Sequence, residues 1–159
     1  EPRFAADAHL GRLARYLRFC GFDTLWDNAW DDADLVAVAA GEARIVLTRD
    51  RALLMHRALA QGCYLRDTAP LAQLADLGAR YALELGSEHQ ARCLDCNERL
   101  DRAPKQDVAG RLLPGTLAGF DEFWRCGRCG GVFWRGSHWR RMREAVDGVA
   151  RAIGNGRTQ

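Results

Sequence analysis

Four of the six cysteines form two C-x-x-C pairs, and this spacing constrains the fold more than any other feature of the 159-residue sequence. The pairs are separated by 29 residues, and each is followed by a residue that tolerates a positive φ angle, Asn97 or Gly130. Four thiolates presented by two such turns form a closed tetrahedral Zn²⁺ site. The sequence therefore predicts a structural zinc ribbon, with disulfides as the alternative. The candidate zinc ligands are Cys93, Cys96, Cys126 and Cys129.

The first residues of the chain indicate whether its cysteines are expected to be oxidised or reduced. The first twenty residues contain arginines and no apolar stretch typical of a secretory signal. We therefore expect a cytoplasmic protein, in which clustered cysteines bind metal more often than they form disulfides. The longest apolar run has six residues, which is too short to span a membrane, so no membrane partner is expected. Cys20 and Cys63 lie in apolar stretches and are expected to be buried and unreactive.

The net charge of +2 hides two opposed parts of the chain. Residues 1–91 carry 10 arginines and 13 acidic residues, whereas residues 92–159 carry 13 basic and 8 acidic residues. Such asymmetry suggests two modules with different roles. We predict an α/β domain over residues 1–91, a zinc ribbon over 92–145 and a C-terminal helix or tail over 146–159. Because the chain begins at Glu1 and not at methionine, we expect it to be a fragment or a processed form.

Short apolar runs alternate with helical patterns in the acidic part. Strands are predicted at residues 3–6, 22–26, 44–48 and 63–65, and helices at about 8–20, 32–41, 51–61 and 70–78, with Gly62 closing the third helix. This alternation predicts a parallel sheet with a ligand site beyond the carboxyl ends of its strands. In the basic part, residues 104–119 are rich in turn residues and predict a loop of the ribbon.

Acidic residues follow every predicted strand of the first part. Asp7, Asp50 and Asp67 come after the first, third and fourth strands, and three further acids follow the second: Asp31, Asp32 and Asp34. Carboxylates gathered at one sheet edge repel one another unless a cation lies between them, and Mg²⁺ or Mn²⁺ prefers oxygen ligands. The alternative is that each acid caps a helix. Asp31 and Asp34 fit a cap and a solvated face, and Asp67 fits either reading.

The segment after the second cysteine pair mixes aromatic residues with arginines. Trp134, Arg135, His138 and Trp139 lie within six residues of one another. Such a mixture stacks on nucleic-acid bases and neutralises phosphates in single-strand-binding proteins. The tryptophans could instead cover the small core of the ribbon. His138 could contact phosphate or act as a general acid, or it could be a structural residue.

With these motifs in hand, the chain resembles the Mut-seven-C ribonuclease domain family. The resemblance covers about residues 3–143 and rests on motifs in order: FAAD at 4–7, LGRLARYLR at 10–18, GFD at 21–23, LTRD at 47–50, RCLDCN at 92–97 and FWRGSH at 133–138. It implies an α/β protein in which a PIN-like three-layer parallel-sheet domain is followed by a small four-cysteine zinc-ribbon module. It also implies a ubiquitin-like domain upstream in some relatives.

The resemblance further implies a metal-dependent ribonuclease. The acidic positions correspond to Asp7, one acid of the Asp31–Asp32 pair, and Asp50; we favour Asp32, with Asp67 as a fourth acid. We expect Asp7, Asp32 and Asp50 to bind Mg²⁺ or Mn²⁺ for cleavage of RNA, preferably single-stranded. The residues expected to contact RNA are Arg12, Arg15, Arg49, Arg51, Arg135 and His138. The alternative function is a non-catalytic zinc module that binds RNA or another partner.

Overall fold

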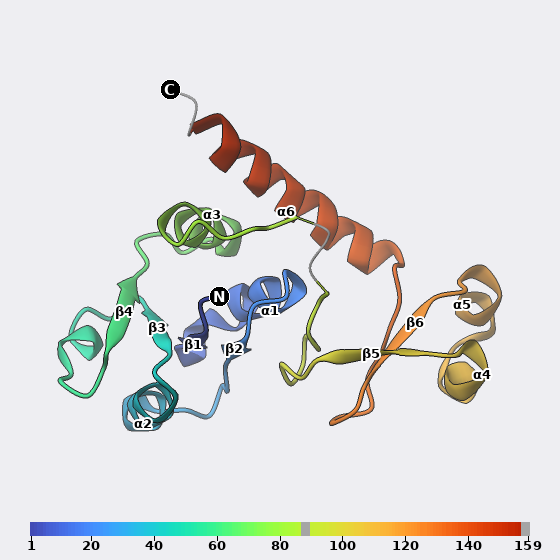
Figure 1. Ribbon diagram of the computed structural model, residues 1–159, viewed down its shortest axis with the longest axis horizontal. Helices are drawn as coiled ribbons and strands as arrows, with labels where there is room; N and C mark the ends of the chain where they lie inside the picture. Colours follow the sequence, from blue (N-terminus) through green and yellow to red (C-terminus); the bar gives the residue numbers. More distant parts are fainter. Residues whose placement is uncertain (87–89, 157–159) are drawn as a thin grey trace.

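The computed structural model describes residues 1–86 and 90–156, and its N-terminal part is an α/β domain. Its four parallel strands follow the order β2-β1-β3-β4 in the sheet (Figure 1). The elements are β1 (Phe4–Ala6), η1 (Ala8–Leu10), α1 (Gly11–Phe19), β2 (Thr24–Leu25), α2 (Asp32–Glu42), β3 (Ile45–Thr48), η2 (Leu53–Met55), β4 (Gln61–Tyr64) and α3 (Pro70–Arg80). The predicted parallel α/β architecture is confirmed.

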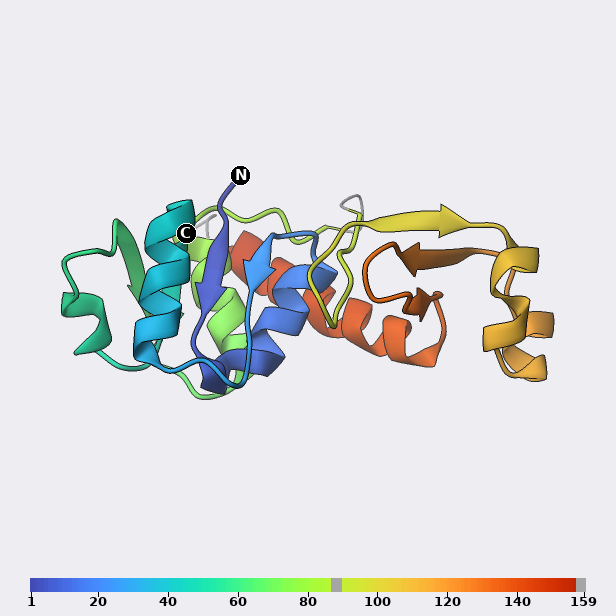
Figure 2. The same cartoon turned by 90° about the horizontal axis from the view of Figure 1, so that it is seen from below.

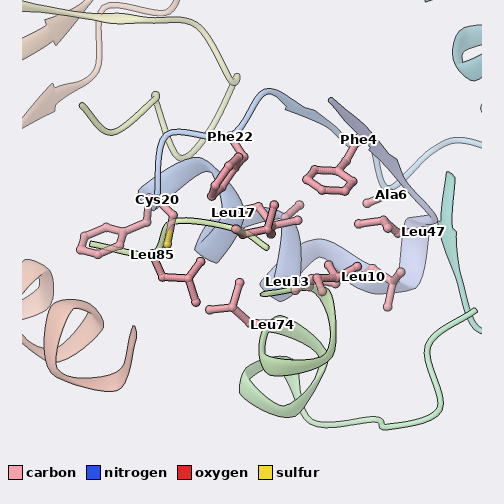
Figure 3. Close-up of a cluster of buried hydrophobic side chains, with 14 of the residues drawn as sticks. Phe4, Ala6, Leu10, Leu13, Leu17, Cys20, Phe22, Leu47, Leu74 and Leu85 are labelled. Carbon is pink, nitrogen blue, oxygen red and sulfur yellow. The ribbon is translucent and has the colours of Figure 1, made fainter. Parts of the chain in front are cut away.

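Helices cover both faces of this sheet and give it three layers. Successive residues of a strand point to opposite faces, so Phe4 and Ala6 of β1 face α1 and α3 while Ala5 faces α2. On the α2 side, Leu35 and Val36 complete a smaller cluster. On the other side a larger apolar cluster fills the space between the sheet and α1, and Figure 3 shows its side chains converging from strands, helices and loops.

The segment between β3 and β4 differs from the prediction. A helix was predicted over residues 51–61, but the structure has only the single 3₁₀ turn η2 there. Only Leu53 of this segment is buried, so a longer helix would have no apolar face to bury against the sheet. Gly62 does not close a helix: it lies within β4, where a Cβ atom would clash with Leu54 Cδ2.

The four-cysteine part forms a separate antiparallel sheet. Its strands are β5 (Leu100–Ala103), β6 (Phe123–Cys126) and β7 (Val132–Phe133), in the order β5-β6-β7. Residues 104–119, predicted as a loop, contain α4 (Lys105–Val108), η3 (Ala109–Arg111) and α5 (Pro114–Gly119). These short helices form because Val108, Leu112 and Phe120 cover Phe123 and so give one face of the ribbon its own core.

The long helix α6 (Ser137–Gly156) runs along both parts of the molecule (Figures 1 and 2). It begins within the range predicted for the ribbon and packs mainly against α3 and, to a lesser extent, α1. Its residues Met142, Val146 and Val149 join the large cluster beneath the parallel sheet. None of the helices in residues 1–86 and 90–156 has both the length and the apolar composition that a membrane span requires.

A polar network joins the ribbon to the amino ends of the parallel strands. The Asp23 carboxylate accepts hydrogen bonds from the Arg44 guanidinium and from Asn97 Nδ2, each at 2.7 Å. The side-chain oxygen of Asn97, Oδ1, accepts a hydrogen bond from the Thr24 backbone N–H at 2.9 Å. Asn97 has a φ of 72°, as expected after the first cysteine pair. Burial opposes ionisation of Asp23, but the hydrogen bonds from Arg44 and Asn97 outweigh it and lower the pKa of the carboxyl.

We expect Asp23→Asn to reduce the free energy of unfolding by about 2 kcal/mol, because it leaves the buried Arg44 guanidinium with only one carboxylate partner, the half-exposed Glu42. The Arg44 side chain is only 6% exposed. The matched control is Asp95→Asn, which breaks the solvent-exposed Arg15–Asp95 pair across the same junction and should cost at most about 1 kcal/mol. Urea unfolding at neutral pH measures both. Equal losses would mean that the Asp23 network does not stabilise the junction.

Candidate active site and metal centre

The first candidate site lies where β1 and β3 end side by side. Asp7 directly follows β1, and Asp50 follows β3 after Arg49. The buried Thr48 hydroxyl connects the two acids: Thr48 Oγ1 donates to Asp7 Oδ2 at 2.8 Å and accepts from the Asp50 backbone N–H at 3.0 Å. Two acids that are distant in sequence are thus held at one edge of the sheet by a single side chain.

The third predicted acid shares a cavity with Asp50. A hollow of about 430 Å³ is lined by Asp32, Asp50 and His56 and by other residues of α2 and η2. Asp32 is the first residue of α2 and is exposed. Its neighbour Asp31 caps the helix, since its side chain accepts from the Asp34 N–H at 2.8 Å while Asp34 accepts from the Asp31 N–H. The expected cap is confirmed, and Asp32 stands outside it.

The three carboxylates are not gathered into one ligand shell. Within residues 1–86 and 90–156, only the four cysteines form a group of three or more metal-ligating side chains whose donor atoms lie within 4.8 Å of one another. Carboxylates without a cation between them repel one another, which favours such separation. Asp50 Oδ1 also accepts from the Ala52 N–H at 2.8 Å, as a residue that starts a turn does.

The remaining predicted residues of this part are dispersed. Asp67 is exposed in the loop after β4, where its backbone carbonyl accepts from Gln73, and it does not line the cavity of Asp32 and Asp50. Arg49 donates to the Arg66 carbonyl at 3.0 Å, and the Arg51 guanidinium lies 4.5 Å from the centre of the Tyr64 ring. On α1, Arg12 is exposed, whereas Arg15 pairs with Asp95 of the ribbon.

The four-cysteine cluster has the geometry of a zinc site. The Cys93 and Cys129 sulfurs lie 3.6 Å apart, the Cys96 and Cys126 sulfurs lie 3.3 Å apart, and all four lie within 4.8 Å of one another. Disulfide-bonded sulfurs would lie about 2.05 Å apart, and all four thiols are free. Four sulfurs at ~2.3 Å from a tetrahedral ion lie about 3.8 Å from one another, so the cluster fits Zn²⁺.

Backbone amides of the second turn favour the thiolate form of Cys126. Burial opposes the charged form of Cys126, but the N–H groups of Cys129 and Arg128 outweigh it and lower the pKa of this thiol to about 7. Burial raises the pKa of the Cys93 thiol. The Gly131 N–H also points to Cys129 Sγ, at 3.4 Å. With no further donor needed, the site is closed and suits a structural ion.

The sheet edge that carries Asp7 and Asp50, called the acidic edge below, includes two residues that were not singled out from the sequence. Thr48 read as the end of a buried strand, and only the parallel register of β1 and β3 shows that its hydroxyl reaches Asp7. His56 read as part of a helix, whereas it lies just after η2 and lines the cavity of Asp32 and Asp50. A polar residue two positions before an acid at a strand end was the signal available for Thr48.

These features define a class of protein: an α/β domain with a four-stranded parallel sheet, joined to an antiparallel ribbon whose four cysteines can bind zinc. The family model described as Mut7-C RNAse domain matches residues 2–146, and the chain belongs to this family. The resemblance seen in the sequence is thereby confirmed, and membership indicates a nuclease-like function with RNA as the substrate. No curated protein and no solved structure matches the chain.

Proposed function

We propose that this protein is a PIN-like, metal-dependent ribonuclease that cleaves single-stranded RNA at the edge formed by Asp7, Asp32 and Asp50. The observation that carries the proposal is the Thr48 hydroxyl, which fixes Asp7 and orients the Asp50 backbone at once. Helix capping does not need a buried side chain that holds two acidic residues together, whereas a functional site needs such support for its side chains. The cavity that Asp32 shares with Asp50 provides the space for a phosphate group.

The donor set fits Mg²⁺ or Mn²⁺, which take carboxylate oxygens and keep several waters. Such an ion, when bound by Asp7, Asp32 and Asp50, lowers the pKa of water and neutralises charge on the phosphate. The protein residues themselves orient the metal ligands and attract the RNA. Thr48 keeps the Asp7 carboxylate oriented, and the exposed guanidiniums of Arg49 and Arg51 attract the RNA backbone to this edge. Mutual repulsion between the acids ends when a cation lies between them.

A second candidate function is a zinc module that binds RNA without cleaving it. Its supporting observation is the hydrogen bond from the Ala52 N–H to Asp50, because a capping role would fully account for that acid. This function predicts RNA binding without added divalent metal and no turnover.

The deciding experiment is a cleavage assay with labelled single-stranded RNA and zinc-loaded protein, first without other divalent metal and then over a titration of Mn²⁺ or Mg²⁺. We expect product to appear only after the second metal is added, while the zinc content stays constant. Absence of cleavage at every concentration of both metals, with RNA still bound, would overturn the nuclease proposal and favour the binding module.

Thr48→Val should reduce the cleavage rate roughly tenfold, because loss of a residue that orients a metal ligand typically costs 10–100-fold. The substitution keeps the branched shape of the side chain but removes the hydroxyl that joins Asp7 and Asp50. We also expect a higher Mn²⁺ concentration at half-maximal rate. Thr48→Ser, which keeps the hydroxyl, is the matched control. If both variants cleave at the parental rate and the same metal concentration, Thr48 does not position the site.

A further inference from the structure

A second, larger cavity lies at the end of α1 that is remote from the acidic edge, since Phe19, the last residue of α1, lines it. It has a volume of about 600 Å³ and is enclosed by the end of α1, one face of the ribbon and the first turns of α6. This volume is far above the packing defects of a protein core and within the ~300–1,000 Å³ typical of ligand pockets. It is distinct from the cavity that Asp32 and Asp50 share.

The ribbon presents an ordered row of side chains to this cavity. In the register of the antiparallel sheet, Arg102 of β5 lies opposite Trp124 of β6, and Trp124 lies opposite Phe133 of β7. Residues directly opposite each other share one face of a sheet, and all three line the cavity. The other face, which carries Phe123, is already covered by the short helices of the ribbon. The row is therefore a flat aromatic surface flanked by a cation.

Helix α6 supplies the facing wall. Trp139 lies with its ring centre 6.0 Å from that of Phe19, at the end of α1. The Arg135 guanidinium lies 5.4 Å from the Trp124 ring centre and 5.0 Å from that of Trp139, so it contacts both indoles. A guanidinium stacked on rings keeps its N–H edge available for phosphate. His138 also lines the cavity and is exposed.

The charge of the lining selects an anion. Four arginines line the cavity, and none of the described residues that line it is Asp or Glu. Arg92, Arg102 and Arg143 each have a carboxylate partner outside the lining, respectively Asp23, Glu122 and Asp147, whereas Arg135 stacks on the indoles. Flat aromatic surfaces next to guanidiniums bind nucleotides, with the base on the ring and the phosphate on the cation.

We propose that this cavity, the aromatic pocket of Arg102, Trp124, Phe133, Arg135 and Trp139, binds one unpaired nucleotide of an RNA strand. The inference rests on the proposed function for the choice of RNA over other anions. It adds a base-binding site away from the acidic edge. Figure 1 shows α1 between the parallel sheet and the ribbon. With nine residues at ~1.5 Å each, α1 keeps the pocket and the edge at least about four stacked nucleotides apart.

The test is RNA binding without divalent metal other than the bound zinc, so that no cleavage takes place. The probe is a fluorescent oligouridine of about twelve nucleotides, a length typical of single-strand-binding sites. Trp124→Leu and Arg135→Gln should each weaken binding roughly tenfold. Arg140→Gln is the matched control, because it removes an exposed arginine of α6 that does not line the pocket, and it should change affinity less than about twofold. Zinc content and the circular dichroism spectrum verify folding of each variant.

Two outcomes would overturn the proposal that the aromatic pocket binds a nucleotide. One is equal affinity of the parent, Arg135→Gln and Arg140→Gln proteins for oligouridine, since the exposed Arg135 can be replaced without loss of the fold. The other is equal competition by inorganic polyphosphate or an acidic peptide, which would mean that charge alone, without a base, accounts for binding.

The nucleotide-binding proposal and the nuclease proposal can be overturned independently of each other. If the parent never cleaves RNA but Trp124→Leu still weakens oligouridine binding, the pocket stands and the nuclease proposal falls. If cleavage depends on Asp7 and Asp50 while the pocket variants bind normally, only the pocket is overturned.

Discussion

Replacing both Asp7 and Asp50 with asparagine is expected to lower RNA cleavage by at least about a thousandfold, because two ligands of the proposed metal would be lost and residues that act as a unit are not additive. Asparagine keeps the size of the side chain, and its carbonyl oxygen can still accept the hydrogen bond that Thr48 donates to Asp7. The measurement is single-turnover cleavage of labelled RNA in saturating Mn²⁺. The fold of the variant should survive intact.

The matched control is Asp27→Asn, an exposed acid whose side chain accepts from the Ala29 N–H in the loop before α2. It should cleave at the parental rate. Asp67→Asn measures whether the loop acid after β4 takes part, and Asp32→Asn measures whether the cavity acid does. Equal residual cleavage by the parent and the double variant would contradict the proposed site and point to a contaminating nuclease.

Cys126→Ser is expected to abolish zinc binding and unfold the antiparallel sheet. A structural Zn²⁺ contributes an apparent ~10–16 kcal/mol at pH 7, as much as the whole stability of a typical domain. Cys126 is the last residue of β6, the central strand of the ribbon, so loss of its thiolate removes a zinc ligand and releases the end of this strand from the ion. Metal analysis should give one zinc per parent chain and none for the variant.

Hydrogen exchange shows which strands lose their structure in the Cys126→Ser variant. Amides of β5, β6 and β7 should lose protection, whereas those of β1 and β3, which lie in a separate sheet, should keep most of theirs. Cys63→Ala is the matched control, because this buried thiol lies in β4 outside the cluster and should leave the zinc content unchanged. Because zinc displaces protons from thiols, zinc affinity should fall as the pH falls. Full zinc and protected β6 amides in Cys126→Ser would contradict a four-cysteine site.

The features that could be predicted from the sequence are those governed by local rules. The cysteine pairs and the positive φ of Asn97 follow from turn chemistry, and the alternation of strands with helices predicts a parallel sheet with Asp7 and Asp50 at one edge. These features repeat at short spacing along the chain, so a single sequence is enough to detect them.

The features that were missed depend on contacts between distant segments. The Thr48 hydroxyl reaches Asp7 across 41 positions, and the Asn97 amide reaches Asp23 across 74. The helical pattern around Leu53 was misleading because burial of an apolar face, and not local propensity, decides whether a helix continues. The aromatic pocket needs the pairing of β5, β6 and β7 together with the approach of α6, and no single segment carries it.

The position of α6 has a consequence for the order in which the chain matures on the ribosome. Val146 and Val149 lie in the same cluster as Phe4 and Ala6, so the first strand made cannot finish burying its apolar side chains until the helix has emerged. The ribbon cysteines are all synthesised before that helix, and zinc can be acquired first. Metal loading would then precede completion of the acidic edge, and newly made chains would remain exposed to chaperones and proteases until their last helix docks.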